Sequence, residues 1–373
     1  MTPLAHVIER FGRPYLDRYA STVLPSQRQA LTAMAACRST LAAQMLADCG
    51  QCGAQRLVPH SCGHRACPHC QQFEGQRWIT RQHRALLDAP YFLVTFTVPA
   101  ELRDLIWQHQ RVLYKALMDC AWGTLASFAR NDQRLRGQAG AVAVLHTHSR
   151  RLEFHPHVHL AMPAGALDAD GRLWRTLRAK GGQAFLFHHQ TLASVFRARL
   201  LEAVRSLALA VPETAPERWV VDCKGVGSGH KVMVYLGRYL YRGVIQERDI
   251  VRCDDQSVSY RWRDAKTGQH QVRTVAGVEF LRLVLQHVLP KGLRRARCYG
   301  LLHPNCRRGV ALRRAMTLKR RPSVPADASP TDSAVRPKLL CHCCGNPMRI
   351  VRRRILSTLA APPPTTTRAE STK

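Results

Sequence analysis

The chain of 373 residues has no run of about 18 apolar residues, which is the length that a transmembrane helix needs. Its first residues, MTPLAHVIERFGRPYL, carry charges where a signal peptide has an apolar stretch, so we expect an intracellular, cytoplasmic protein. A GxxxxGK[ST] phosphate-binding loop is also missing, and the sequence therefore indicates no ATP-driven chemistry. Acidic residues are scarce, with 25 Asp and Glu against 56 Lys and Arg.

The resulting net charge of +31 predicts a polyanionic partner, and nucleic acid is the usual one in a cell. Only nine of the 56 basic residues are Lys, and the planar guanidinium of Arg suits phosphate. Residues 280–326 contain twelve basic residues and no acidic one, which predicts contact with a nucleic-acid backbone. The alternatives are a basic arm without a defined partner and a genomic preference for Arg.

The chain has 14 cysteines, which in an intracellular protein indicate metal ligands rather than disulfides. Two CxxC pairs lie 14 residues apart and predict one tetrahedral, structural zinc site: Cys49, Cys52, Cys67 and Cys70. Three residues inside or beside this knuckle compete as ligands: Cys62, His64 and His69. A redox CxxC is the alternative.

A second zinc site is predicted near the C-terminus, where a CxxC pair follows an HxxC pair by about 35 residues: His303, Cys306, Cys341 and Cys344. The alternative is an unpaired CxxC in a flexible tail.

Apolar periodicity predicts an α+β protein. Helices are expected over residues 1–45 (with helix formers continuing to 47), 73–88, 101–130, 189–210, 230–245 and 276–289. Strands are expected over residues 91–99, 141–148, 155–162, 219–225 and 257–264, with a hairpin connecting the second to the third.

The pentapeptide HPHVH at residues 155–159 indicates a metal site. On a strand, His157 and His159 point to one face and Val158 to the other, buried face. His146 on the preceding strand supplies a third ligand if the register allows it. Three other residues are alternatives, because the sequence does not define the register: His148, Glu153 and His155.

Tyr235 and Tyr239 lie four residues apart and therefore share one face of a predicted helix. An aromatic pair in the core is one interpretation. Three phosphate-binding cations flank the pair, which a dry core does not require: Lys231, Arg238 and Arg242. A tyrosine, a divalent metal and cations together can cleave a DNA phosphodiester through a phosphotyrosine ester.

The sequence resembles the HUH transposases of the two-tyrosine, rolling-circle insertion-sequence class over residues 25–315. The segments that carry the likeness are CGQCG…SCGHRACPHCQ, YFLVTFTVP, VLHTHSRRLEFHPHVHLAM, AGALDADGRLW, FRARLLEAVR, VMVYLGRYLYR and FLRLVLQHVLPKGLRRARCYGLL. Two positions depart from the pattern: Ala66 and Tyr241 each replace an expected His, and the second adds a third tyrosine.

The resemblance implies a central antiparallel sheet with the HUH triplet, flanked by helices, preceded by a small zinc-binding domain and followed by a basic, partly disordered tail. The expected division is 1–90 for the helical segment and the knuckle from Cys49 to Cys70, 91–290 for the catalytic domain, 291–321 for a basic DNA-binding extension, and 322–373 for a linker, the possible zinc-binding CxxC and the tail.

The resemblance also implies that His157 and His159 bind Mg²⁺ or Mn²⁺ and that Tyr235 and Tyr239 are the nucleophiles. The predicted protein is a bacterial DNA transposase that cleaves and joins single-stranded DNA at element ends through 5′-phosphotyrosine intermediates, and it associates with the nucleoid when it acts. Arg238 and Lys231 complete the predicted catalytic set, and the expected DNA-binding residues are Arg242, Lys291, Arg294, Arg295 and Arg297.

Two other functions compete. A plasmid or phage replication initiator shares the catalytic core, although the knuckle favours a transposase. A non-catalytic, zinc-dependent DNA-binding protein would instead bury the tyrosines in its core.

Overall fold

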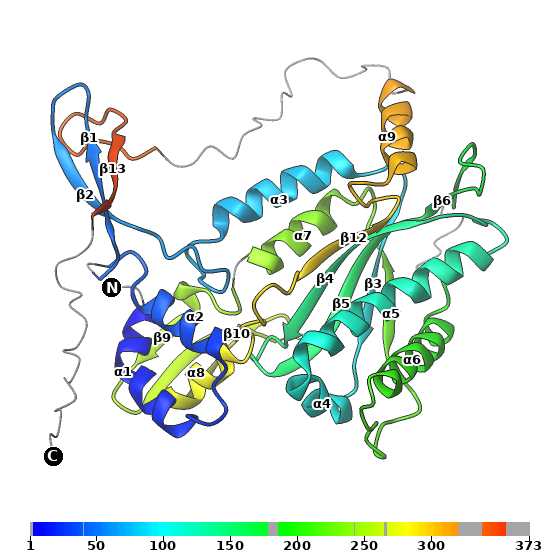
Figure 1. Cartoon of the computed structure of the whole chain (residues 1–373), viewed down its shortest axis with the longest axis horizontal. Helices are drawn as coiled ribbons and strands as arrows, with labels where there is room; N and C mark the ends of the chain where they lie inside the picture. Colours follow the sequence, from blue (N-terminus) through cyan, green and yellow to red (C-terminus); the bar gives the residue numbers. More distant parts are fainter. Residues whose placement is uncertain are drawn as a thin grey trace, which may run out of the picture.

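The computed structural model describes residues 3–39, 41–177, 186–241, 243–264, 267–319 and 338–355 (Figure 1). A five-stranded antiparallel sheet lies at its centre, in the order β12-β4-β5-β3-β8. The strands are β3 (Tyr91–Thr97), β4 (Gly140–His148), β5 (Phe154–Pro163), β8 (Val221–Gly225) and β12 (Ala296–Gly300). The predicted α+β class with a central antiparallel sheet is confirmed.

Helices cover both faces of the central sheet (Figure 1). Val158, Leu160 and Met162 of β5 are buried on one face, where the core includes side chains of α4, α5 and α6. Ala161 belongs to the opposite face, which packs against α3 and α7. The helices are α3 (Gln72–Ala85), α4 (Arg103–Gln108), preceded by the 3₁₀ turn η1 (Ala100–Leu102), α5 (Gln110–Asn131), α6 (His189–Ser206) and α7 (His230–Tyr241). Since side chains alternate along a strand, His157 and His159 lie on the α7 side.

The register of the central strands aligns the polar residues of that side. In the β4–β5 hairpin His146 pairs with His157, and Val144 pairs with His159. On the other edge of β5, Thr95 of β3 pairs with His159. The histidines of β4 and β5 therefore occupy neighbouring positions on one face of the sheet.

A second unit joins the N-terminal helices to the C-terminal part of the predicted catalytic segment. Its sheet, in the order β11-β10-β9, packs with α1, α2 and α8 in a core of its own. The elements are α1 (Pro3–Arg18), α2 (Pro25–Ala35), η2 (Glu247–Asp249), β9 (Ile250–Cys253), β10 (Ser257–Arg263), β11 (His270–Ala276) and α8 (Gly277–Leu285). The Glu247 carboxylate accepts hydrogen bonds from Leu4 N (2.8 Å) and pairs with His69 Nε2 (2.9 Å), which ties the N-terminal helices to this unit.

A third sheet, in the order β13-β1-β2, projects from the body of the molecule (Figure 1). Its strands are β1 (Gln44–Asp48), β2 (Gln55–Pro59) and β13 (Arg349–Ile355). The prediction of helix over residues 1–45 is wrong at its end. The last helix there, α2, stops at Ala35, and residues from Gln44 form β1, the central strand of this sheet, whose backbone pairs on both sides. The remaining short strands, β6 (Gly165–Leu167) and β7 (Trp174–Thr176), pair with each other.

The basic segment is more ordered than an extension or arm would be. β12 pairs with β4, with Ala296 opposite Val144, and α9 (Arg307–Lys319) follows it. Residues 320–337, with Arg320 and Arg321, and residues 356–373 lie outside the described residues. Within the described part, no helix is both long and apolar enough to cross a membrane.

The other predicted helices and strands are present.

The packing of α7 on α3 gives a test of the fold. Gly237 of α7 faces α3 so closely that an added Cβ would overlap the Ile79 side chain and lie 3.0 Å from Trp78 Cε3. We expect Gly237→Ala to lower the free energy of unfolding by about 1–3 kcal/mol, the usual effect of overpacking. Gly225→Ala is the control, since its nearest neighbour would be Phe92 Cε1 at 3.8 Å. Urea unfolding followed by circular dichroism measures both, and equal stabilities would contradict this packing.

Candidate functional site

The three histidines that the sequence singled out as metal ligands meet on the central sheet. Ligand atoms of His146, His157 and His159 all lie within 4.8 Å of one another. The ring centroid of His146 is 4.2 Å from that of His159 and 5.0 Å from that of His157. One ligand comes from β4 and two from β5, as the cross-strand pairing of His146 with His157 requires.

The donor chemistry of this triad fits a metal ion. His157 Nδ1 donates to the His155 carbonyl (2.7 Å), and His159 Nδ1 lies 2.8 Å from Thr95 Oγ1, which leaves both Nε2 atoms for a metal. His146 is fully buried, yet neither of its ring nitrogens has a hydrogen-bond partner among the described residues. Such orphaned nitrogens are costly unless a ligand satisfies them.

The same burial keeps the imidazoles neutral. It lowers the pKa of His157 to about 4 and that of His159 to about 3, and it places the pKa of His146 well below its ordinary value. Neutral imidazole is the form that coordinates a metal. At neutral pH the triad is therefore ready to bind a cation without releasing protons.

The alternative ligands have other partners. The ring of His155 accepts a hydrogen bond at Nδ1 from Arg103 (2.8 Å), and Glu153 forms ion pairs with Arg151 and Arg273. His148 stacks on Tyr239, with ring centroids 4.7 Å apart. The β4–β5 register, which the sequence did not define, thus makes His146 the third candidate ligand.

The two predicted nucleophiles face the triad from α7. The Tyr235 ring lies 5.8 Å from that of His159 and 6.4 Å from that of His146. The Tyr239 ring stacks on His146 with centroids 3.4 Å apart, and its hydroxyl donates to the His148 carbonyl (3.0 Å). Tyr235 is 44% exposed, whereas Tyr239 is partly buried. Burial raises the pKa of both phenols above the ordinary value, so both are protonated at neutral pH.

The third tyrosine of α7 points elsewhere. Tyr241 packs toward α3, where its ring lies 6.4 Å from Trp78 and its Cβ lies beside Gly75. Because a helix advances about 100° per residue, Tyr241 leaves the face that Tyr235 and Tyr239 share. The departure at this position therefore adds no further hydroxyl to the triad.

A cavity of about 770 Å³ opens beside the tyrosine pair and is strongly basic. The predicted residues Lys231 and Arg238 are exposed along its wall. Several other lining residues, which were not predicted from the sequence, come from the β4–β5 loop, η2 and β10: Arg150, Arg248, Arg261, Trp262 and Arg263. Against six Lys and Arg side chains, the lining contains a single acidic residue, Asp249. Only the clustering of Arg and Trp in SVSYRWR signalled part of this set.

The predicted DNA-binding residues do not all remain available. Arg295 Nε donates to the Leu145 carbonyl (3.0 Å), and its guanidinium lies 5.8 Å from the Tyr239 ring, so it supports the site from behind. Arg297 forms an ion pair with Asp119 (2.9 Å). Arg297 lies in β12 and Arg295 directly before it, so the fold uses both guanidinium groups for contacts within the protein. Lys291 and Arg294 are exposed, and Arg242 lies outside the described residues.

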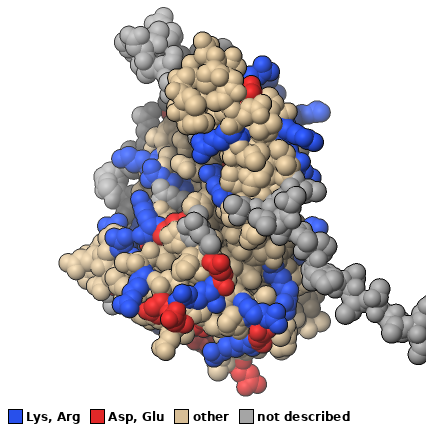
Figure 2. All heavy atoms as spheres, turned by 90° about the vertical axis from the view of Figure 1, so that its left-hand side faces the viewer, with Lys and Arg blue, Asp and Glu red and all other residues tan. Residues whose placement is uncertain are grey.

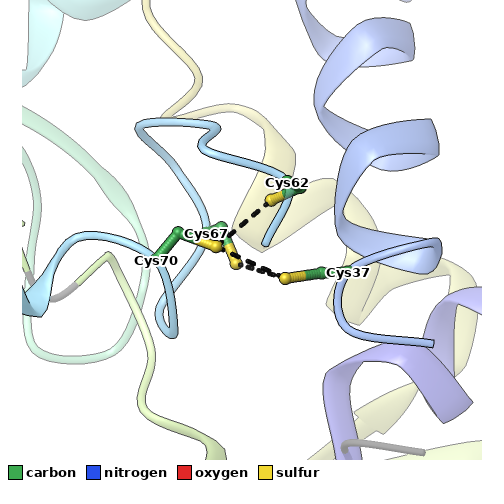
Figure 3. Close-up of side chains that lie close together, drawn as sticks. All are labelled: Cys37, Cys62, Cys67 and Cys70. Atoms are coloured by element: carbon green, nitrogen blue, oxygen red, sulfur yellow. Dashed lines mark hydrogen bonds between the residues drawn. The ribbon is translucent and has the colours of Figure 1, made fainter. Parts of the chain in front are cut away.

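The predicted knuckle divides between two thiol clusters. Figure 3 shows the first, in which Cys67 and Cys70 meet Cys37 and Cys62. Its sulfur atoms are 3.4 Å (Cys37–Cys70), 3.6 Å (Cys62–Cys70) and 3.7 Å (Cys67–Cys37) apart. Tetrahedral Zn²⁺ with Zn–S bonds of about 2.3 Å places sulfurs about 3.8 Å apart, and a disulfide needs about 2.0 Å. The spacing fits a zinc tetrathiolate.

The second cluster joins Cys49 and Cys52 to Cys341 and Cys344, with sulfur distances of 3.5 Å (Cys49–Cys344) and 3.6 Å (Cys52–Cys341). The single-site prediction is therefore wrong. Cys49 and Cys52 lie at the tip of the β1–β2 hairpin, whose strands of five residues span about 16 Å, and Cys67 follows the base of the hairpin.

The predicted pairing of His303 and Cys306 with the C-terminal CxxC is also wrong. Both residues belong to the turn between β12 and α9, on the opposite side of the molecule from β13 (Figure 1). His303 Nδ1 instead accepts a hydrogen bond from Asn305 N (3.2 Å). The first cluster contains neither His64 nor His69. His64 Nδ1 accepts a hydrogen bond from Ala66 N (3.2 Å), and His69 pairs with Glu247.

The Thr95 hydroxyl predicts a measurable contribution to metal affinity. Thr95→Val removes the hydrogen-bond partner that orients His159, and we expect Mn²⁺ affinity to fall about 10–100-fold. Thr97→Val is the control, because Thr97 lies on the same strand and face but has no side-chain hydrogen bond in the described part of the chain. Electron paramagnetic resonance titration with Mn²⁺ measures both, and equal affinities would contradict the assignment of His159.

Comparison with known proteins places this site in a family. Residues 7–98 match the family model described as a transposase zinc-binding domain, and residues 140–309 match the one described as a putative transposase. No solved structure matches the chain.

Two bacterial transposases are similar over most of their length. The chain is 33% identical over 322 residues to a putative transposase, y4qJ, of Sinorhizobium fredii (strain NBRC 101917 / NGR234), covering 80% of each protein. It is 30% identical over 302 residues to the transposase for insertion sequence element IS801 of Pseudomonas savastanoi pv. phaseolicola, covering 74% of this chain and 70% of the relative. The chain therefore belongs to the IS91 family of two-tyrosine transposases, with an N-terminal zinc-binding domain and a histidine triad of the HUH type.

Proposed function

We propose that this transposase cleaves single-stranded DNA at the ends of a rolling-circle-type insertion sequence and transfers the strands through 5′-phosphotyrosine intermediates. The observation that carries the proposal is the approach of Tyr235 and Tyr239 to a triad of neutral histidines with free ring nitrogens. Neither a structural core nor a DNA-binding surface requires that combination.

His146, His157 and His159 would hold Mg²⁺ or Mn²⁺, and three imidazoles favour Mn²⁺ of the two. When bound, the ion polarises the scissile phosphate and stabilises the charge that develops during attack. The triad would supply three ligands and would leave other coordination positions of the ion to phosphate oxygens.

Tyr235 is the nucleophile that we assign to the first cleavage. Its side chain is exposed to the cavity, and its hydroxyl has no hydrogen bond among the described residues. The phenol oxygen loses its proton and attacks phosphorus, the bond from phosphorus to the 3′ oxygen breaks, and the 3′ oxygen takes up a proton. The 5′ phosphate remains on tyrosine as an ester.

The Tyr239 hydroxyl is not available for attack in this arrangement, because it donates to the His148 carbonyl while the ring stacks on His146. We assign it to the second cleavage, after this hydrogen bond breaks. Attack of a free 3′-hydroxyl on a phosphotyrosine then restores a phosphodiester and releases the tyrosine hydroxyl. Each ester conserves the bond energy, so the reaction consumes no nucleotide.

The basic cavity would guide the DNA strand to the tyrosines. Lys231 and Arg238 lie on the same helix as the nucleophiles and would neutralise the phosphates next to the cut. Trp262 lines the same cavity, and an aromatic face there can stack with an unpaired base.

The competing functions are less well supported. A replication initiator would share the triad and the tyrosines, but the family matches favour the transposase. A non-catalytic DNA-binding protein would bury both tyrosines in an apolar core, whereas Tyr235 opens onto a basic cavity.

Single tyrosine variants test the assignment of the nucleophiles. With Mn²⁺ and a single-stranded oligonucleotide carrying the element end, we expect Tyr239→Phe to keep forming a covalent protein–DNA adduct, because Tyr235 remains. Tyr235→Phe should lose most of this first adduct, and the double variant should lose all of it. Denaturing gel electrophoresis with labelled DNA measures the adduct.

Tyr241→Phe is the matched control, because this tyrosine lies on the same helix and packs against Trp78. It should form the adduct at the parent rate. An adduct that persists in the double variant would overturn the nucleophile assignment, and tight DNA binding without an adduct under any metal would favour the non-catalytic protein.

A histidine variant separates catalysis from DNA binding. We expect His157→Ala to abolish cleavage while its DNA affinity stays within about twofold of the parent, because phosphate contacts supply most of that affinity. His155→Ala is the control, since this ring binds Arg103 and should leave cleavage intact. Adduct formation and fluorescence anisotropy measure the two properties. Normal cleavage by His157→Ala would show that the metal ligands are wrongly assigned.

A further inference from the structure

The N-terminal and C-terminal CxxC pairs form two turns of the same construction. In each, the glycine after the second cysteine has positive φ (72° for Gly53 and for Gly345), a conformation that favours glycine. Its N–H donates to the carbonyl of the first cysteine, at 2.8 Å for Gly53 to Cys49 and 3.0 Å for Gly345 to Cys341.

The hydrogen bonds of the first cysteines also match. Cys49 N donates to the Ala54 carbonyl (2.9 Å), and Cys341 N donates to the Asn346 carbonyl (2.8 Å), five residues on in both turns. Asn346 Nδ2 lies 3.5 Å from Cys344 Sγ. Two matching turns that direct four sulfurs to one point are the pattern of a zinc ribbon.

The apolar core around these turns is too small to hold them together by itself. Among the described residues its buried members are Ala47, Cys49, Cys341 and Met348. So few buried side chains do not offset the conformational entropy of ordering residues 338–355. A metal bond is the usual substitute in a module of this size. The family match to a zinc-binding domain ends at residue 98, so Cys341 and Cys344 lie beyond it.

The C-terminal strand β13 adds a concentrated positive charge to the unit formed by residues 41–60 and 338–355, which we call the ribbon. Residues 41–60 and 338–355 contain six basic residues against one acidic residue, Asp48. Four of the six are exposed arginines of β13: Arg349, Arg352, Arg353 and Arg354. None of these four forms a salt bridge among the described residues. Figure 2 shows Lys and Arg over both the upper and the lower parts of this side of the molecule, whereas most of the acidic residues lie in the lower part.

β13 is an edge strand, paired with β1 on one side only. Its arginines therefore project on both faces at the rim of the ribbon, where they can flank one DNA backbone. Charge on an edge strand also prevents sheet-to-sheet aggregation, and that role would not require DNA.

We propose that Cys49, Cys52, Cys341 and Cys344 bind a second structural zinc, which fastens β13 to the N-terminal hairpin and so presents its arginines to DNA phosphates. The zinc site stands independently of the proposed cleavage reaction, and the DNA contact deepens that reaction by adding a docking surface outside the active site. This zinc site would join residues almost 300 positions apart in the chain, and the central sheet is formed by the residues between them.

Zinc content tests the metal site. The purified full-length protein should contain two zinc ions per chain by inductively coupled plasma mass spectrometry, with sulfur-only coordination by X-ray absorption. Cys341→Ser combined with Cys344→Ser should contain one. Cys343→Ser is the matched control, since Cys343 is exposed in the same turn but lies outside the group of four. Loss of zinc from Cys343→Ser, or two zinc ions in the double variant, would overturn the ligand set.

DNA binding tests the arginine strand. The triple variant Arg352→Gln, Arg353→Gln, Arg354→Gln should keep two zinc ions, while its binding to a labelled mixed-sequence duplex should become less salt-dependent. Each lost phosphate contact lowers the slope of log K against log salt by about 0.9, so we expect a decrease of about 2 to 3. The Cys341→Ser, Cys344→Ser variant should show a similar decrease.

A charge-matched control substitutes three exposed arginines on and near α5 and α6: Arg130→Gln, Arg205→Gln and Arg218→Gln. Its slope should stay at the parent value. An unchanged slope in the strand variant, or an equal decrease in the control, would overturn the docking role. The strand variant should still form the covalent adduct at saturating oligonucleotide. If the unsubstituted protein forms no adduct, the cleavage proposal fails. The zinc content and the salt dependence of DNA binding still test the second zinc site and its docking role.

Discussion

The antiparallel pairing of β4 with β5 is the constraint on which the site depends. It places His146 opposite His157 and leaves His159 one step along the same face. A shift of one residue would turn these side chains into the apolar layer that contains Val158 and Leu160. The close contact of α7 with α3 through Gly237 then sets how far Tyr235 and Tyr239 stand from the triad. The β4–β5 register and the α7–α3 contact together therefore fix the positions of the histidines and tyrosines of the site.

The positive charge of the chain is divided among different roles. Arg65 donates to the carbonyls of Leu289, Pro290 and Leu293 and so fastens the first thiol cluster to the segment after α8. Arg295 and Arg297 stabilise the sheet edge from inside. The cavity beside Tyr235 and the rim of the ribbon keep their cations exposed. Net charge indicates a polyanion, but the fold decides which cations remain to bind it.

The thiol clusters link parts of the chain that have little else in common. The first packs against the core of α1, α2 and α8 and joins the end of α2 to the start of α3. The second lies at the far end of the β1–β2 hairpin and receives its other two thiols from the C-terminal strand. The short β1–β2 hairpin thus separates the two thiol clusters, one within the body of the molecule and one at its periphery.

Much of this protein was readable from local patterns. Alternation along β5 assigned His157 and His159 to one face, and the four-residue spacing of Tyr235 and Tyr239 assigned them to one side of a helix, because both patterns depend on neighbouring residues alone. The CxxC turns were equally visible, since each is closed within a few residues. The partners were not: Cys37 carries no spacing signal, and the cationic lining comes from separate elements. The sequence alone identified the histidines of β5, the tyrosine pair of α7 and the CxxC turns as candidates for metal binding and nucleophilic attack. Only the tertiary structure decided that Cys49 meets Cys344 and that Arg295 turns inward, because contacts across hundreds of residues depend on strand pairing that no local pattern encodes.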